Sequence, residues 1–274
     1  MTAATVGSVL AEAQRRIERV DAQALLAHVL QRDTAFLIAH ANDPVEETAR
    51  ATYMTLVTRR ISGEPVAYLT GRREFFSRDF RVTPDVLIPR PETELLVELA
   101  LERLPHDRPA RVLDLGAGSG CVGITIALER PRAHVTCVDR SSAALDVARD
   151  NAARLRCPNV ELLEGSWYDA VTGRRFDVLV SNPPYVAERD AHLGALRFEP
   201  REALVSGTDG YAAIRAIAEG APTHAAPDAW LLFEHGHEQA AEARKLLEQL
   251  AYTQVFSARD LAGIERVTGG MLRG

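Results

Sequence analysis

Two short segments of the sequence carry residue types that could do chemistry together. One is the glycine-rich segment 114–120, and the other is 181–185, which holds an asparagine, two prolines and a tyrosine. Each follows or ends a short apolar run that predicts a β-strand, over 111–115 and 176–181. The carboxyl ends of parallel strands meet at one edge of a sheet, where doubly wound sheets hold nucleotides. We therefore expect the two segments to face one crevice.

The glycines of 114–120 are spaced so that a ligand could approach the backbone closely. Gly116, Gly118 and Gly120 have no Cβ atom and permit a tight turn. A dinucleotide fingerprint G-x-G-x-x-G would need its third glycine at Cys121, and no G-x-x-x-x-G-K-[ST] phosphate loop occurs. The spacing instead resembles the first motif of class I S-adenosylmethionine-dependent methyltransferases, which implies that Asp114 lies near the methionine amine. The same resemblance gives the cofactor-binding residues of the turn as Asp114, Gly116, Ala117, Gly118, Ser119 and Gly120.

Two further residues could complete a nucleoside site. Asp139 ends the second predicted strand, about 20 residues beyond the glycines, where a carboxylate can accept hydrogen bonds from ribose hydroxyls. Its alternative role is to cap the next helix. The methyltransferase resemblance adds Trp167 beside the adenine, and the alternative for this tryptophan is packing.

The tetrad Asn182-Pro183-Pro184-Tyr185 is typical of enzymes that methylate a nitrogen conjugated with a π system. An amide nitrogen is a poor nucleophile because its lone pair is delocalised into the carbonyl group. The side-chain oxygen of Asn182 and the backbone carbonyl of Pro183 can each accept one N–H, which aligns the nitrogen with the methyl group of the cofactor. The prolines stiffen the loop, and Tyr185 offers a flat face to a planar substrate. We expect direct displacement at the methyl carbon, without a metal, with all four residues contacting substrate and Asn182 also bordering the cofactor.

The elements around these segments predict an α/β fold. Strands are expected over 111–115, 134–139, 160–163, 176–181 and 230–234, with helices between them. This alternation predicts a mostly parallel, doubly wound sheet of the class I methyltransferase type. An antiparallel pair within 252–272 would bring the sheet to seven strands.

The region before the sheet has a different pattern of residue types. Apolar residues at helical spacing predict a small all-α domain over 1–63, in which Asn42-Asp43-Pro44 begins one helix. Aromatic and β-branched residues broken by glycine and proline predict a hairpin connector over 64–88. The methyltransferase domain is then expected over 89–274.

Composition narrows the function classes. The net charge of −6 disfavours broad binding to nucleic-acid phosphates. No secretory signal or membrane span is visible, so we expect a cytoplasmic protein. We expect a monomer, because no obvious coiled coil or exposed apolar helix is visible. Cys121, Cys137 and Cys157 have no C-x-x-C spacing and suggest neither disulfides nor a zinc site.

The tetrad also occurs in DNA adenine-N6 methyltransferases, which leaves the substrate open. Such enzymes carry basic target-recognition regions, whereas the first 80 residues here hold ten arginines and ten acidic residues. A third possibility is a methyltransferase-like fold that only binds a partner. The combination of Asp114, Asp139 and Asn182 argues against it, because a scaffold has no need of all three.

Motifs along nearly the whole chain resemble the release factor glutamine methyltransferases. The most discriminating are the connector and the proline-rich segment after it, and the full set is Glu64-Pro65-Val66-Ala67-Tyr68-Leu69-Thr70-Gly71, Ile88-Pro89-Arg90-Pro91-Glu92-Thr93-Glu94, the glycine turn, the tetrad, Glu199-Pro200-Arg201-Glu202-Ala203-Leu204 and Asp260-Leu261-Ala262-Gly263. The resemblance implies N5-methylation of the glutamine in the Gly-Gly-Gln motif of class 1 release factors. It also implies that the helical N-terminal domain grips this protein substrate. His235 departs from the family pattern, which has an isoleucine or a similar residue there.

Overall fold

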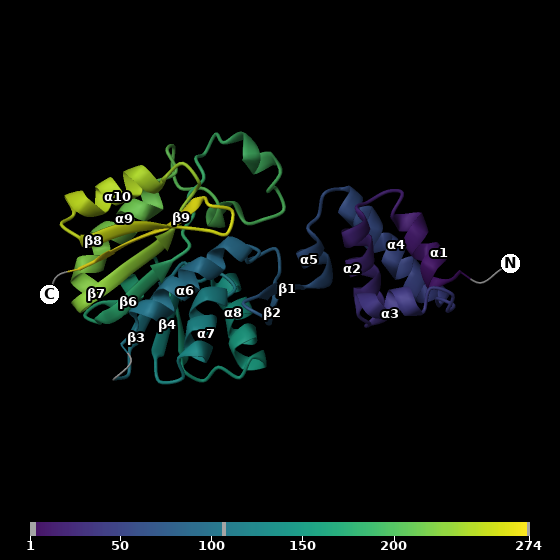
Figure 1. The fold of residues 1–274 in the computed structure, drawn as a ribbon, viewed down its shortest axis with the longest axis horizontal. Helices are drawn as coiled ribbons and strands as arrows, with labels where there is room; N and C mark the ends of the chain where they lie inside the picture. The colour runs from purple at the N-terminus through teal and green to yellow at the C-terminus, as the bar shows by residue number, and fades with distance from the viewer. Residues whose placement is uncertain (1–3, 106–107, 273–274) are drawn as a thin grey trace. The chain divides into compact units, whose positions relative to one another are not determined.

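The computed structural model describes residues 4–105 and 108–272, which form two compact units divided between Arg72 and Arg73 (Figure 1). The first unit is all-helical. Its helices are α1 (Val6–Ala13), α2 (Arg19–Leu30), α3 (Thr34–Ala39), α4 (Glu47–Ile61) and α5 (Val66–Thr70). They enclose a core that includes Leu25, Leu26 and Tyr53, and the Tyr53 hydroxyl donates to the buried carbonyl of Ala22 at 3.1 Å.

One expected helix start in this unit was wrong. Asn42-Asp43-Pro44 does not begin a helix, because α4 starts at Glu47. Residues 43–45 instead pair with residues 4–6, through Val6 N to the Asp43 carbonyl at 3.0 Å and Val45 N to the Ala4 carbonyl at 2.9 Å. This non-local pairing outweighs the local helix signal.

The segment 64–88 holds a helix as well as the expected hairpin. Its β-branched and aromatic residues predicted strands, but Val66–Thr70 forms α5, which ends where Gly71 adopts a left-handed φ of 71°. Tyr68 and Leu69 are buried on this helix, so packing decides its conformation. The hairpin is shorter than predicted, with β1 (Arg72–Phe75) and β2 (Arg78–Arg81).

The second unit is built on a seven-stranded sheet. Its strands are β3 (Arg111–Leu115), β4 (His134–Asp139), β5 (Val160–Glu164), β6 (Phe176–Ser181), β7 (Ala225–Glu234), β8 (Thr253–Arg259) and β9 (Glu265–Met271). The strand order is β5-β4-β3-β6-β7-β9-β8, in which the first five strands are parallel and β9 runs antiparallel to both of its neighbours. The predicted mostly parallel, doubly wound fold is confirmed.

Helices cover both faces of this sheet. They are α6 (Glu94–Arg103), α7 (Cys121–Glu129), α8 (Ser142–Arg154), α9 (Ala212–His224) and α10 (Ala240–Gln249), with 3-10 turns at η1 (Pro91–Thr93), η2 (Asp169–Val171), η3 (Ala191–Gly194) and η4 (Arg201–Ala203). Alternate residues of β6 face different cores: Val178 and Val180 pack in the cluster with α6 and α7, and Leu179 packs in the cluster with α9 and α10. A strand buried on both faces explains the continuous apolar run of 176–180.

Candidate active site

The glycine turn after β3 is held against the next strand. The amides of Gly116 and Ala117 both donate to the Val138 carbonyl, at 2.8 and 3.1 Å. Gly118 has a left-handed φ of 54° and nothing within 4 Å of where a Cβ would stand, so its side of the turn is open. Gly120 combines a φ of 78° with close packing, since a Cβ there would lie 2.7 Å from Ile124. The turn therefore needs glycine for shape at one end and for helix packing at the other.

Asp114 is a buried carboxylate beside the turn. Its side chain lies at the end region of β3, lines the pocket described below and accepts a hydrogen bond from Gly123 N at 2.9 Å. Burial raises the pKa of Asp114 to about 7, and the nearby charge of Asp139 acts in the same direction. A positive group bound beside this carboxylate would oppose both effects.

The carboxylate of Asp139 accepts hydrogen bonds from two loops, the glycine turn and the segment before α8. One carboxylate oxygen accepts from Gly118 N at 2.8 Å, and the other accepts from Ser141 N at 2.9 Å. The cap of α8 is the Ser141 hydroxyl, which accepts from Ala144 N at 3.2 Å. Asp139 thus shapes the approach to the helix while each of its oxygens keeps a further lone pair for a ligand.

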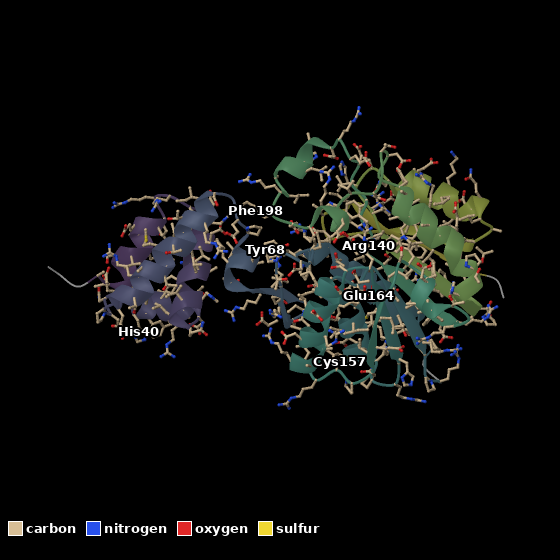
Figure 2. All side chains as sticks on the ribbon, turned by 180° about the vertical axis from the view of Figure 1, so that it is seen from behind. His40, Tyr68, Arg140, Cys157, Glu164 and Phe198 are labelled. Carbon is tan, nitrogen blue, oxygen red and sulfur yellow. The ribbon has the colours of Figure 1, made fainter. Side chains whose placement is uncertain are left out.

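The two predicted segments border one pocket. It holds about 1020 Å³ of empty space, part of it open to solvent, at the carboxyl edge of the sheet. Arg140, which is labelled in Figure 2, is one of its lining residues. The expected site residues that line the pocket are Asp114, Gly116, Ala117, Gly118, Ser119, Asp139, Trp167, Asn182 and Pro184.

Three expected site residues do not line this pocket: Gly120, Pro183 and Tyr185. Gly120 is packed against α7 and α8, and Pro183 is buried. Trp167 does line the pocket, with a left-handed φ of 50°, and it also packs against the core on the α9 and α10 face. The position of Trp167 therefore fits both of its expected roles, contact with a ligand and packing against the core.

Asn182 follows β6, whose end is fixed when the Ser181 hydroxyl donates to the Leu115 carbonyl at 2.6 Å. The Asn182 amide nitrogen donates to the hydroxyl of Thr93 at 3.1 Å. Its amide oxygen is buried and forms no hydrogen bond with any residue that the structure describes. Buried polar atoms are nearly always paired, so this oxygen is available to a ligand in the pocket.

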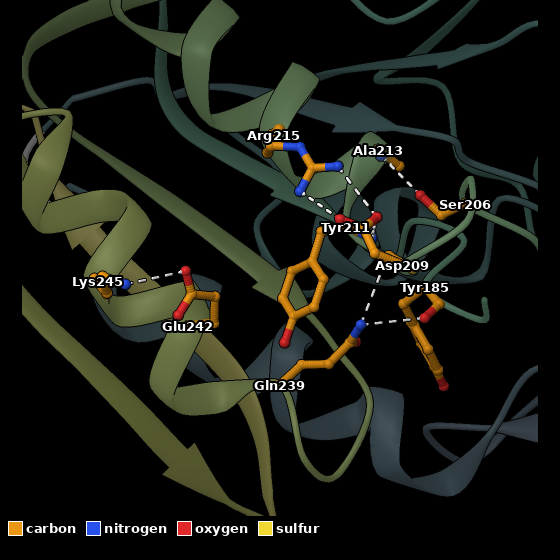
Figure 3. A network of polar contacts seen from close by, with 10 residues as sticks. Tyr185, Ser206, Asp209, Tyr211, Ala213, Arg215, Gln239, Glu242 and Lys245 are labelled. Atoms are coloured by element: carbon orange, nitrogen blue, oxygen red, sulfur yellow. Dashed lines mark hydrogen bonds and ion pairs between the residues drawn. The ribbon is translucent and has the colours of Figure 1, made fainter.

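Tyr185 forms hydrogen bonds through both its backbone carbonyl and its side-chain hydroxyl. Its carbonyl accepts from the amide of Gln239 at 3.2 Å, and the same amide donates to the Gly210 carbonyl at 3.3 Å (Figure 3). The side-chain amide oxygen of Gln239 accepts a hydrogen bond from Gly236 N at 2.8 Å. The Tyr185 hydroxyl lies 3.5 Å from a carboxylate oxygen of Glu234, and burial, reinforced by that carboxylate, raises the tyrosine pKa. The loop after Asn182 is thereby tied to the segment that follows β7.

Thr93 and Glu234 were not predicted as site residues. Thr93 is one of the residues that line the pocket, and its hydroxyl donates to a carboxylate oxygen of Glu234 at 2.6 Å. Burial raises the pKa of Glu234 to about 7, against the opposing effects of the Thr93 hydrogen bond and of Arg266. One signal was available, since Glu234 ends an apolar parallel strand as Asp139 does, whereas nothing local distinguishes Thr93 except its place in the Ile88–Glu94 motif.

Two motifs that are far apart in sequence hold each other at the pocket wall. The Arg90 guanidinium donates to one carboxylate oxygen of Glu199, and Ile88 N donates to the other at 3.1 Å. Pro89 and Pro200, which lie beside these residues in the chain, both line the pocket. The buried Glu199 carboxylate therefore positions two wall segments at once.

Within the described ranges, no helix is long and apolar enough to cross a membrane. Over the same residues, no group of three or more histidine, cysteine, aspartate or glutamate side chains is arranged to hold a metal ion. Cys121, Cys137 and Cys157 are buried free thiols, and burial raises the pKa of each. They are accordingly poor nucleophiles.

Comparison with known families matches both units. A family model described as "PrmC N-terminal domain" matches residues 4–71, and one described as "Methyltransferase small domain" matches residues 93–203. Among solved structures, the hMettl16 catalytic domain in complex with MAT2A 3′UTR hairpin 1 superposes with a TM-score of 0.59 at 11% identity, covering 84% of each chain. The T. thermophilus 16S rRNA N2 G1207 methyltransferase, in complex with AdoMet and guanosine, gives 0.56 at 21% identity, covering 74% of this chain and 50% of that one. At these identities the likeness is one of fold, the methyltransferase fold.

Curated relatives are much more similar in sequence. The release factor glutamine methyltransferase of Bordetella pertussis is 52% identical, with 93% of this chain and 96% of the relative covered. That of Xylella fastidiosa (strain Temecula1) is 49% identical, with 97% and 98% covered, and that of Salmonella typhimurium is 43% identical, with 92% and 91% covered. The chain belongs to the release factor glutamine methyltransferase family.

Proposed function

We propose that this protein transfers a methyl group from S-adenosylmethionine to the side-chain amide nitrogen, N5, of the glutamine in the Gly-Gly-Gln motif of class 1 release factors. The observation that carries the proposal is the buried, unpaired amide oxygen of Asn182 in the pocket bordered by the glycine turn. An acceptor without a donor fits an amide substrate, which brings N–H groups and lacks a nucleophilic lone pair. Membership of the family supports the same substrate.

The pocket residues fit the proposed cofactor. The buried carboxylate of Asp114 suits an amino group, and the oxygens of Asp139 retain lone pairs for ribose hydroxyls. The open side of Gly118 leaves room for a ligand against the backbone, and Trp167 offers an aromatic wall for the adenine. When bound, S-adenosylmethionine supplies a methyl group on positively charged sulfur that is open to direct displacement.

The chain's own part in the reaction is to aim the substrate nitrogen. In our proposal the Asn182 oxygen and the Pro183 carbonyl each accept one amide N–H, and Tyr185 lies against the planar amide. Acceptors stabilise the positive charge that grows on nitrogen as the N–C bond forms. As the N–C bond forms, the bond between the methyl carbon and the sulfur breaks, and S-adenosylhomocysteine is the leaving group. The nitrogen then loses its proton to water, so no strong base is needed before the transfer. We also assign the helical N-terminal unit to recognition of the protein substrate.

Asn182→Ala tests this proposal. We expect the loss of turnover to reach about 10³-fold, because the variant removes a preorganised acceptor for developing charge. Cofactor affinity should stay within about threefold, since the glycine turn and both aspartates remain. The assay follows radiolabelled methyl transfer to a purified class 1 release factor, with calorimetry for cofactor binding. Near-normal turnover in the variant would contradict the proposal.

The substrate is tested by two controls in the same assay. A release factor in which the Gly-Gly-Gln glutamine is replaced should accept no label, because the reacting nitrogen is gone. Duplex DNA with unmodified adenine should also stay unlabelled. Label in the adenine, or in the glutamine-less factor, would assign the activity to another nitrogen, and cofactor binding without any transfer would favour a binding protein.

A further inference from the structure

A buried chain of polar contacts leads from the end of β7 to the unpaired oxygen of Asn182. It joins three elements: Glu234 ends β7, Thr93 ends η1 and Asn182 follows β6. Thr93 is 1% exposed and Glu234 is 2% exposed. The two links measure 2.6 Å, from the Thr93 hydroxyl to the Glu234 carboxylate, and 3.1 Å, from the Asn182 amide nitrogen to the Thr93 oxygen.

The number of protons available fixes which atom donates and which accepts at each hydrogen bond of this chain. An ionised carboxylate can only accept, so Thr93 must donate its single hydroxyl proton to Glu234. The Thr93 oxygen is then left as an acceptor toward Asn182, and only the NH₂ half of that amide can meet it. The oxygen half must therefore point away from Thr93. This oxygen has no partner among the described residues, and Asn182 itself lines the pocket.

We propose that Glu234 and Thr93 are positioning residues that hold the Asn182 amide in the one orientation that presents its oxygen to the substrate. This inference rests on the proposed function, in which that oxygen accepts a substrate N–H. In the opposite orientation the amide would present its NH₂ group to the N–H groups of the substrate, donor against donor. The chain thus sets which of two nearly isosteric orientations is populated.

The same geometry makes the orientation sensitive to the ionisation of Glu234. Burial raises the Glu234 pKa to about 7, and the charged or titratable groups that act on it are Arg266, which lowers the pKa, Glu92, which raises it, and the hydrogen-bonded Tyr185. The buried thiol of Cys121 also lies within the field of this carboxylate. Tyr185 and Cys121 both have raised pKa values, so neither ionises near neutral pH.

The sign of the effect follows directly. Above about pH 7 Glu234 is ionised and fixes the hydroxyl proton of Thr93, which fixes Asn182. Below about pH 7 protonated Glu234 can donate to Thr93, and the threonine proton is free to turn toward the oxygen of a flipped Asn182. We therefore expect kcat, measured with both substrates saturating, to fall as the pH drops through about 7. The amide nucleophile has no titration in this range that could imitate this loss.

Thr93→Val is the first test. It keeps the shape and removes the hydroxyl, and we expect kcat to fall by about 10- to 100-fold, since small errors in aim have effects of this size. The KM for S-adenosylmethionine should stay within about twofold. Thr93→Ser, which keeps the hydroxyl, should restore most of the activity. The matched control is Thr125→Val, because Thr125 is fully buried and its hydroxyl meets no partner within the described residues.

Glu234→Gln is the second test, compared with Glu248→Gln, which removes an exposed carboxylate. A glutamine can either accept from Thr93 or donate to it, so we expect a smaller fall in kcat, about 3- to 10-fold, and a kcat that no longer declines below pH 7. The control should keep both the rate and the acid decline of the wild type. The wild-type pH profile remains informative even if a variant folds poorly.

Two outcomes would overturn the inference: wild-type kcat in Thr93→Val, or an unchanged acid decline in Glu234→Gln. Failure of the proposed function looks different, because Asn182→Ala would then keep its turnover. Loss of turnover in Asn182→Ala together with full activity in Thr93→Val would leave the function standing and remove only the positioning role.

Discussion

Glu234 and His235 are neighbours in sequence, yet the polar chains they belong to differ in one respect. The chain from Glu234 passes through Thr93 to Asn182 and stops at an oxygen without a partner. The chain through His235 is closed: its Nδ1 contacts the Gly236 carbonyl at 2.9 Å and its Nε2 contacts the Thr268 hydroxyl at 2.9 Å. Both chains lie within the second unit, where Thr93, Glu234, His235 and Thr268 are buried.

The closed chain can be traced donor by donor. Arg244 donates to the Ser257 hydroxyl at 2.7 Å, and Ser257 lies 2.7 Å from the Thr268 hydroxyl. A carbonyl can only accept, so the proton of His235 sits on Nδ1, and Nε2 accepts from Thr268. Burial lowers the pKa of His235, which keeps the ring neutral.

The difference between the two chains indicates a structural role for one and a binding role for the other. A buried network whose atoms all pair rigidifies the fold and gains nothing from a ligand. A network that ends in an unpaired acceptor has a reason to meet a donor from outside. His235 belongs to the first kind, and Asn182 belongs to the second.

His235→Ala gives the largest expected effect on stability. Removing the ring leaves a cavity and strands the Thr268 hydroxyl, so the free energy of unfolding should fall by about 3 kcal/mol, more than 100-fold in the folding equilibrium. Turnover per folded molecule should remain within about twofold. Urea unfolding and an assay at low temperature measure the two quantities. A large loss of turnover in a fully folded variant would erase the distinction between the chains.

The pH dependence of cofactor binding gives an intermediate effect. Asp114 has its pKa raised to about 7 by burial, and binding of an ammonium group beside it would favour the ionised form. Affinity for S-adenosylmethionine should therefore weaken about tenfold between pH 8 and pH 6, as the carboxylate becomes protonated. Calorimetry at several pH values measures this, and Asp114→Asn should bind weakly at every pH. A pH-independent affinity would show that no cation sits beside this carboxylate.

These two titrations can be told apart because they affect different quantities. In our proposals, Asp114 acts on cofactor affinity, whereas Glu234 acts on kcat once cofactor and substrate are saturating. An acid decline that disappears at saturating cofactor belongs to Asp114, and one that persists belongs to Glu234.

The parts of the fold that sequence predicted well are those with local causes. Strands β3, β4 and β6 begin and end where predicted, because their apolar runs are bounded by turn residues and a carboxylate. The glycine turn and the tetrad are likewise local in sequence. The helix start at Asn42 failed because a pairing with residues 4–6 overrode the local signal.

The unpredicted parts of the site depend on contacts between distant residues. Thr93 meets Asn182 across 89 positions and Glu234 across 141 positions. No spacing rule connects such residues, and only the topology of the sheet brings β6 and β7 side by side with η1 beside them. The sequence could therefore indicate Asn182 as a hydrogen-bond acceptor, but it could not indicate that Thr93 and Glu234 contact it in a chain.

Ser257→Ala gives the smallest effect and tests the closed chain at its midpoint. The variant removes one hydroxyl between Arg244 and Thr268, while Arg244 keeps its ion pair with Glu265 at 3.2 Å. We expect the free energy of unfolding to fall by about 1 kcal/mol, the usual size for one buried hydrogen bond, and kcat to stay unchanged. Because Thr268 can still donate to His235, the fall should be smaller than in His235→Ala. If urea unfolding instead shows an equal loss in both variants, the chain acts as one unit whose members cannot be assigned separate contributions.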